Sequence, residues 1–389
     1  MHHDISLLPH LLPDHSKGTA ASHLTTSISQ SGFSTPTSGS RSAFLGTSVG
    51  QATLTLVSHL ENPEASLYEP DALQGCVELL NGALQVALKD DGDIPEDGCE
   101  VLYGRAGFLY ALLHLRSAAK STKADPSEVN AIMPLVSDQA IKAIVDDIVN
   151  RGRIGAQHYQ EDLADGSQAP KLMWVWHGKR YLGGAHGVAG ILQMLLQSPP
   201  EIIKPYFPLI YDTVEWLISL QGPDGNWPHV ASTHPSRQAE QELVEWCHGA
   251  PSMVILLSRL ICHPTSPPST LASSAKSSLQ KGAQCVYKRG LLRKGVGLCH
   301  GVAGSIYALL DASHTLDNSE SKTWIERAMY LAVRATEWEA LVRDGEMRMP
   351  DRPYSLYEGL GGMCCAWAAV LGGVDNVPRG MVGYADLEV

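Results

Sequence analysis

Six segments of the chain repeat one plan, a glycine-rich turn followed by an apolar run of helical length. This repetition limits the possible folds more than any other feature of the sequence. Glycines 104, 187, 249, 301 and 359 mark five of the turns, with spacings of 83, 62, 52 and 58 residues. Such a spacing accommodates one helical hairpin with its loops. The six segments begin at Phe44, Leu102, Tyr181, Trp246, Gly297 and Ser355.

The runs that follow these glycines are apolar nearly all round, as in "GILQMLL" and "MCCAWAAVL". A helix of that kind must be buried on every side. Amphipathic stretches such as "IKPYFPLIYDTVEWLISLQG" and "KTWIERAMYLAVRATEWEALV" lie between them, with apolar residues at three- and four-residue spacing. Buried inner helices that alternate with amphipathic outer helices predict an all-α fold, an α/α toroid of two layers. A superhelical solenoid is the alternative, but its helices would not need to be apolar all round.

In such a toroid the glycines stand at the N-terminal ends of the inner helices, so all the turns gather at one mouth of the barrel. Glycine permits tight turns and a close approach between backbones. Residues in those turns therefore converge although they are far apart in the sequence. Cys247 and Cys299, 52 residues apart in "WCHGAPS" and "GLCHGVAG", are expected to meet there.

Composition excludes several classes of protein. With 389 residues, 44% of them hydrophobic and 18% charged, the chain can bury a large core. A net charge of −12 argues against a nucleic-acid partner. No apolar run reaches the roughly 18 residues of a membrane span, and the start of the chain has no signal-peptide pattern. The eight scattered cysteines favour reduced thiols, so we expect a cytoplasmic protein, with peripheral membrane association left open.

The predicted domain organisation is simple. Residues 16–42 are rich in Ser, Thr and Gly without an apolar period, so we expect residues 1–43 to be a disordered or atypical N-terminal segment. Residues 44–389 form the predicted toroid domain. The proline-containing patch 262–278 is expected to be a surface loop between helices.

Two thiolates and an imidazole in converging turns favour zinc. Catalytic zinc typically takes three protein ligands and keeps one open position. Cys247, Cys299 and either His248 or His300 would make such a site, and spacing alone does not choose between the histidines. Buried cysteines are otherwise ordinary small hydrophobic residues, as we expect of the pair at 364 and 365. The pair at 262 and 263 lacks a following glycine and is left out of the site.

The motifs "YGRAGFLYALL", "AHGVAG", "WCHGAP", "GLCHGVAG" and "SLYEGLGG" resemble those of the lanthionine synthetase C-like family, particularly its eukaryotic members. The resemblance runs from about Phe44 to the C-terminus and implies an α/α toroid of seven repeats. Six are visible here, which leaves closure of the barrel open. Ser252 stands where the family usually has glycine.

The resemblance implies one zinc ion per chain, with ligands Cys247, Cys299 and His300. It also implies an enzyme that adds the thiol of glutathione to dehydroalanine or dehydrobutyrine residues of proteins or peptides, forming a thioether. Glutathione and such dehydroamino-acid substrates are the implied partners. Zinc coordination deprotonates a thiol, and the addition then needs an acid to protonate the α-carbon.

Candidates for that acid lie in the same turns. The family resemblance points to His186, in "GGAHGVAG", and to His248. It also points to Glu100, although a carboxylate at a helix N-terminus is stabilised by the helix dipole in any case.

Cationic and anionic groups for glutathione are expected beside two of the turns. Lys294 and the segment "RMPD" (Arg348, Met349, Pro350 and Asp351) match family positions that contact glutathione. Arginine grips a carboxylate with two hydrogen bonds, and Asp351 could meet the γ-glutamyl ammonium. The main alternative is a regulatory protein that binds glutathione and keeps the zinc site without chemistry. A prenyltransferase-type zinc toroid, whose metal site usually includes a carboxylate, has no matching signature.

Overall fold

The computed structural model describes residues 34–66, 68–89, 96–163, 166–233, 243–316, 318–372 and 380–387. Within these ranges the chain is helical, with two isolated β-bridges and no strand, so the all-α prediction is confirmed. The longer helices are α2 (Ser48–Glu61), α3 (Pro70–Ala87), α4 (Arg105–Ser121), α6 (Asp138–Asp162), α7 (Val188–Leu195), α9 (Phe207–Ser219), α10 (Ala250–Ile261), α11 (Ser269–Arg289), α12 (Val302–Thr315), α13 (Asn318–Ala335) and α15 (Leu360–Leu371). The shorter ones are α5 (Pro126–Ile132), α8 (Pro200–Ile203), α14 (Trp338–Arg343) and the 3-10 turns η2 (Gly39–Arg41), η3 (Pro63–Ala65) and η4 (Lys204–Tyr206).

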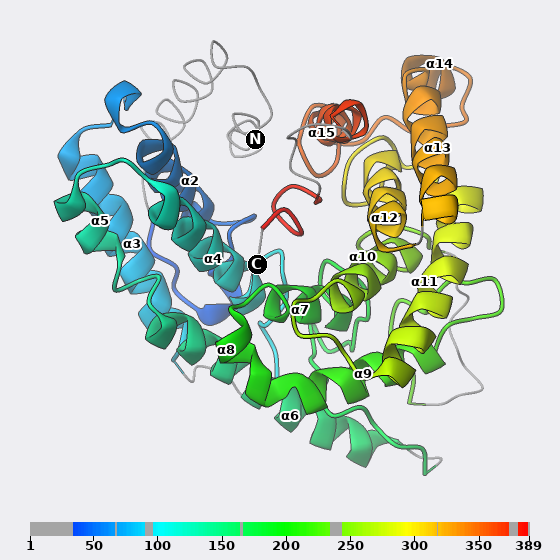
Figure 1. Ribbon diagram of the computed structural model, residues 1–389, viewed down its shortest axis with the longest axis horizontal. Helices are drawn as coiled ribbons and strands as arrows, with labels where there is room; N and C mark the ends of the chain where they lie inside the picture. The colour runs from blue at the N-terminus through cyan, green and yellow to red at the C-terminus, as the bar shows by residue number, and fades with distance from the viewer. Residues whose placement is uncertain are drawn as a thin grey trace.

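The helices form two layers (Figure 1). The inner helices α2, α4, α7, α10, α12 and α15 follow one another in an arc, each packed against the next. The outer helices α3, α6, α11 and α13 pack against α2, α4, α10 and α12, and α9 packs against α11. The predicted toroid of alternating inner and outer helices is therefore confirmed. Helix α7 is buried at every residue, as its all-round apolar sequence requires.

Helix α15 departs from the expectation of full burial. Cys365 is buried, but Cys364 is exposed, as is Leu371 at 84%. The helix stands at one end of the arc (Figure 1), so one of its faces lacks an inner neighbour among the described residues. The prediction that both cysteines are buried was wrong for Cys364.

The mouth glycines lie at the helix N-termini, as the repeat pattern predicts. Glycines 104, 187, 249, 301 and 359 are the N-caps of α4, α7, α10, α12 and α15. These caps have no side chain to satisfy the first N–H groups of the helix. The backbone of the turn does so instead: Val188 N–H donates to Tyr181 O and Val302 N–H to Gly295 O, at 3.1 and 3.2 Å.

Backbone hydrogen bonds also join each turn to the next around the mouth. They run from Ala43 N to Tyr103 O, Val101 N to Ala185 O, Gly184 N to Trp246 O, Cys247 N to Cys299 O and Cys299 N to Tyr357 O, all between 2.8 and 3.1 Å. The turns lie so close that a Cβ on Gly183 would meet Cys247 O at 2.0 Å. Glycine is therefore required there by contact between neighbouring turns.

The turn before α10 differs from the others. Gly249 has φ +110°, a left-handed conformation that favours glycine, and Asn226 caps the helix by accepting from Ala250 N–H at 2.9 Å. In the repeat of α7, the carbonyl of Gly184 in the turn lies against Gly190 of the helix. In the repeat of α10, the equivalent carbonyl, of Trp246, accepts a hydrogen bond from the neighbouring turn instead. Ser252, at the position equivalent to Gly190, is buried and donates to Gly249 O at 3.2 Å, so the departure from glycine is accommodated.

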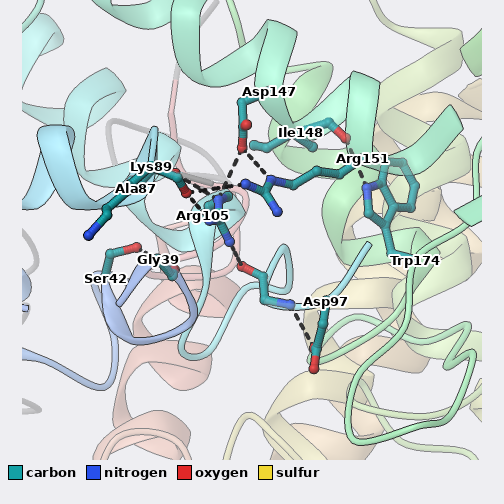
Figure 2. A network of polar contacts seen from close by, with 11 residues as sticks. Gly39, Ser42, Ala87, Lys89, Asp97, Arg105, Asp147, Ile148, Arg151 and Trp174 are labelled. Atoms are coloured by element: carbon teal, nitrogen blue, oxygen red, sulfur yellow. Dashed lines mark hydrogen bonds and ion pairs between the residues drawn. The ribbon is translucent and has the colours of Figure 1, made fainter. Parts of the chain in front are cut away.

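A buried ionic network fixes the loop before α4 (Figure 2). The Arg105 guanidinium, 1% exposed, donates to Ala87 O at 2.8 Å and to Gly98 O at 3.2 Å. Asp147 of α6 pairs with Arg105 at 3.0 Å and with Arg151 at 2.7 Å. Charge pairs of this kind are costly to bury and costly to break. The network therefore holds the segment 96–100, which ends in Glu100, against the outer layer.

The C-terminal segment 380–387 lies in the middle of the arc (Figure 1). Its Asp386 accepts from the Tyr110 hydroxyl of α4 at 2.9 Å. Its Tyr384 ring lies edge-on to Trp246 with 4.9 Å between centroids. The Tyr357 hydroxyl donates to Val382 O at 3.1 Å. The segment thereby supports two mouth turns.

Two predictions concern irregular segments of the chain. The prediction of a loop over residues 262–278 was wrong beyond residue 268, because α11 begins at Ser269. Leu271, Ala275 and Leu279 form a buried face there, and this tertiary packing overrides the serine-rich composition.

Of the N-terminal segment 1–43, residues 1–33 lie outside the described residues, and residues 34–43 pack beside α3 and α4. The described residues contain no helix long and apolar enough to cross a membrane.

Candidate metal centre

Three side chains with metal-binding atoms meet at the mouth. Cys247 lies in the turn before α10, and Cys299 and His300 lie in the turn before α12. Their ligand atoms are all within 4.8 Å of one another. The peptide groups of the two turns are joined by the hydrogen bond from Cys247 N to Cys299 O, at 3.1 Å. Cysteines from neighbouring repeats thus converge, as the repeat pattern predicts.

The geometry separates the two histidines that spacing left equivalent. His300 belongs to the three-residue group and His248 does not. The hydrogen bond with Cys247 raises the pKa of His300. The contact with Cys299, together with burial, raises the pKa of the Cys247 thiol well above its ordinary value. Three metal-binding atoms this close to one another can hold a metal ion.

The donor set fits zinc. In a tetrahedral site with Zn–S of about 2.3 Å and Zn–N of about 2.0 Å, neighbouring ligand atoms are separated by roughly 3.5–3.8 Å. The observed limit of 4.8 Å lets the three atoms reach that arrangement by small side-chain rotations. Three protein ligands would leave a fourth position for a substrate thiol.

A carboxylate that the sequence analysis missed stands beside the group. Glu245 is 4% exposed, and its Oε2 accepts from the Cys247 thiol at 3.4 Å. Its Oε1 is 2.8 Å from the Lys294 ammonium. The only sequence signal was an acidic residue two positions before Cys247, within the same turn.

His186 and Glu100 form a pair at the same mouth. His186 Nδ1 is 2.8 Å from Glu100 Oε2, and the carboxylate is 1% exposed. Glu100 also accepts from the backbone N–H groups of Leu102 and Tyr103, at 2.8 and 2.6 Å. The carboxylate therefore satisfies backbone donors near a helix N-terminus and contacts a histidine at the same time.

Aromatic rings that the sequence analysis did not select surround His186. The rings of Tyr103 and Trp176 are nearly parallel to it, with centroids 6.1 and 5.6 Å away. Tyr181 contacts both His186 and His248, at 5.9 and 5.4 Å. Tyr181 thus links the His186 pair to the turn that carries Cys247.

His248 sits in an environment that disfavours its charged form. Burial, followed by the neighbouring His229, lowers the pKa of His248 to about 4. The imidazole is therefore neutral near pH 7 and is poorly suited to donate a proton as an imidazolium. This environment argues against His248 as the general acid and leaves it able to accept a hydrogen bond.

The predicted glutathione contacts lie on two adjoining loops. Arg348 N–H donates to Arg293 O at 2.7 Å, and Pro350 lies 3.4 Å from the Cβ position of Gly295. The segment Arg348–Asp351 is therefore next to the loop that carries Lys294. Arg348, Met349 and Asp351 are largely exposed, with Met349 at 50%.

Comparisons with known proteins agree with these motifs. The family model for lanthionine synthetase C-like proteins matches residues 27–379. A zebrafish (Danio rerio) protein named glutathione S-transferase LANCL1 is 30% identical over 294 residues, which cover 73% of this chain and 62% of the relative. An Arabidopsis thaliana protein named LanC-like protein GCL1 is 31% identical over 295 residues, which cover 72% of this chain and 58% of the relative. The matched part of the chain thus spans about three fifths of the length of these relatives.

Proposed function

Because this chain belongs to the lanthionine synthetase C-like family, we propose that it is a zinc-dependent enzyme that adds the glutathione thiol to dehydroalanine or dehydrobutyrine residues. The carrying observation is the group of Cys247, Cys299 and His300, within 4.8 Å of one another at the mouth. The name of the zebrafish relative, a glutathione S-transferase, supports glutathione as the thiol. The proposed substrates are proteins or peptides that contain a dehydroamino acid, and the proposed location is the cytoplasm.

The proposed metal ligands are these three residues, with one zinc ion per chain. A bound zinc ion would supply deprotonation of a coordinated thiol near neutral pH. Lys294 and Arg348 are proposed to hold the two carboxylates of glutathione, and Asp351 its ammonium. Their loops adjoin beside the turn that carries Cys299, so the three charged groups can act on one ligand.

His186 is the proposed proton donor to the α-carbon of the substrate. The Glu100 carboxylate, which two backbone N–H groups hold in place, contacts His186 Nδ1 and so favours a proton on that atom. The opposite ring atom, Nε2, is then the one able to carry and release the second proton of an imidazolium. Glu100 thus acts as a positioning residue, and His248, which is neutral, is proposed to orient the substrate carbonyl or thiol at the rim.

The rings around His186 are proposed to exclude water from this transfer. Trp176 is 8% exposed, and it lies nearly parallel to both His186 and Tyr103. Water at the site would compete for the proton and weaken the charge interaction between Glu100 and His186.

Mass spectrometry of a dehydrobutyrine peptide incubated with the protein and glutathione tests the proposal. We expect the peptide to gain the mass of one glutathione, and the gain to disappear with His186→Ala or Cys299→Ala. An unchanged peptide together with tight glutathione binding would favour the regulatory alternative.

A further inference from the structure

Glu245 occupies an unusual place for a carboxylate without an assigned role. It is 4% exposed, and its Oε2 lies 3.4 Å from the Sγ of Cys247. Burial of a carboxylate is unfavourable unless it is paired. Its partner is Lys294, whose ammonium is 2.8 Å from Oε1 and 3.2 Å from Oε2.

The distance between Glu245 and Cys247 is that of two ligands on one metal. For a tetrahedral zinc ion with a Zn–O bond of about 2.0 Å and a Zn–S bond of about 2.3 Å, the oxygen and sulfur are roughly 3.5 Å apart. Glutamate is an ordinary zinc ligand. Glu245 nevertheless lies outside the group whose atoms are all within 4.8 Å of one another. Glu245 therefore contacts one proposed ligand, Cys247, and its side chain would have to rotate for the carboxylate to coordinate the metal.

Lys294 holds the carboxylate in this outer position. Both carboxylate oxygens contact the same ammonium, which reaches in from a side chain that is 47% exposed. An ion pair with a buried carboxylate opposes transfer of that carboxylate to a neighbouring cation. Removing the ammonium would leave the Glu245 carboxylate buried beside the metal without a compensating charge. The metal ion would then be its most favourable partner, and the carboxylate would coordinate it.

We propose that Glu245 is a latent fourth ligand of the metal and that Lys294 is a positioning residue that keeps it off. The inference rests on the zinc centre proposed above. The Lys294–Glu245 pair would keep the fourth position open for thiols, and the lysine would be needed even for ligands without a carboxylate. Lys294 would then have a role in addition to any contact with glutathione.

Cobalt(II)-substituted protein with imidazole as the probe tests this inference. Imidazole is neutral and has no carboxylate, so its binding does not need Lys294 as an anion clamp. Its occupation of an open position changes the visible spectrum of the cobalt ion. We expect Lys294→Met to weaken imidazole binding by about tenfold or more, since a site closed in nine molecules of ten binds about tenfold more weakly.

Three further variants identify the cause. In Lys294→Met with Glu245→Gln, we expect imidazole affinity to return to that of Glu245→Gln alone, because Lys294 acts only through Glu245. Arg293→Met is the matched control, because it removes a cation from the same loop. The Arg293 guanidinium donates to Gly345 O, and we expect the substitution to leave imidazole affinity unchanged. Circular dichroism confirms that each variant is folded.

Three results would overturn the inference, in two distinguishable ways. The first is an imidazole affinity in Lys294→Met equal to that of the wild type, and the second is a loss of affinity that is equally large with and without the Glu245→Gln substitution. Either of these would show that Glu245 does not compete for the metal, with the zinc centre itself unaffected. A wild-type protein that takes up no cobalt would refute the metal centre and the inference together.

Discussion

Replacing Gly183 with alanine tests whether contact between neighbouring turns positions the metal ligands. The new Cβ would meet Cys247 O at 2.0 Å, Cys247 C at 2.7 Å and His248 Cα at 2.9 Å. All three atoms belong to the backbone of the turn that carries a proposed ligand. Since an ordinary carbon–oxygen contact is at least about 3.2 Å, the two turns must separate by roughly 1 Å.

A displacement of that size moves the backbone that carries Cys247 relative to Cys299 and His300, and restoring metal–ligand distances to within about 0.2 Å would then require strained side-chain conformations. We expect Gly183→Ala to lower zinc affinity about tenfold or more and to cost about 1–3 kcal/mol of stability by overpacking. Zinc affinity is measured by competition with a chromogenic chelator, and stability by urea unfolding.

Gly75→Ala is the matched control. Gly75 lies inside α3, and a Cβ there meets no atom within 4 Å. We expect the free energy of unfolding to rise by about 0.5–1 kcal/mol, because alanine has the higher helix propensity, with zinc affinity unchanged. Unaltered stability and zinc affinity in Gly183→Ala would refute the role assigned to contact between the turns.

Three further predictions concern the ligands, glutathione and the buried network. Metal analysis should find about one zinc ion per chain in the wild type and in His248→Ala, and much less in His300→Ala; the reverse pattern would invert the assignment. Arg348→Ala should weaken glutathione binding about tenfold in calorimetry with zinc retained, and normal affinity would exclude the "RMPD" contact. Asp147→Ala should cost about 3–5 kcal/mol in urea unfolding, because the change removes a carboxylate that contacts two buried guanidiniums. Asp138→Ala, which removes the exposed carboxylate paired with Arg116, should cost less than about 1 kcal/mol. Equal losses of stability in the Asp147 and Asp138 variants would contradict the argument.

The sequence by itself determined the architecture. The glycine-to-helix repeat predicted inner helices with their N-termini at one mouth, and glycines 104, 187, 249, 301 and 359 cap those helices. It predicted the convergence of Cys247 and Cys299 because turns of neighbouring repeats must adjoin in a toroid. Periodicity of this kind is a local property that reports directly on which face of a helix is buried.

Only the tertiary structure decided which side chains share the mouth. Spacing could not choose between His248 and His300, because each follows a cysteine and the choice depends on how two turns face each other. Glu245 had no signal beyond its charge, since its pairing with Lys294 joins residues 49 positions apart. The exposure of Cys364 and the helix at 269–278 were likewise set by neighbours that no local pattern encodes. Packing between distant segments decided these points, because it fixes burial and charge pairing after the helices have formed.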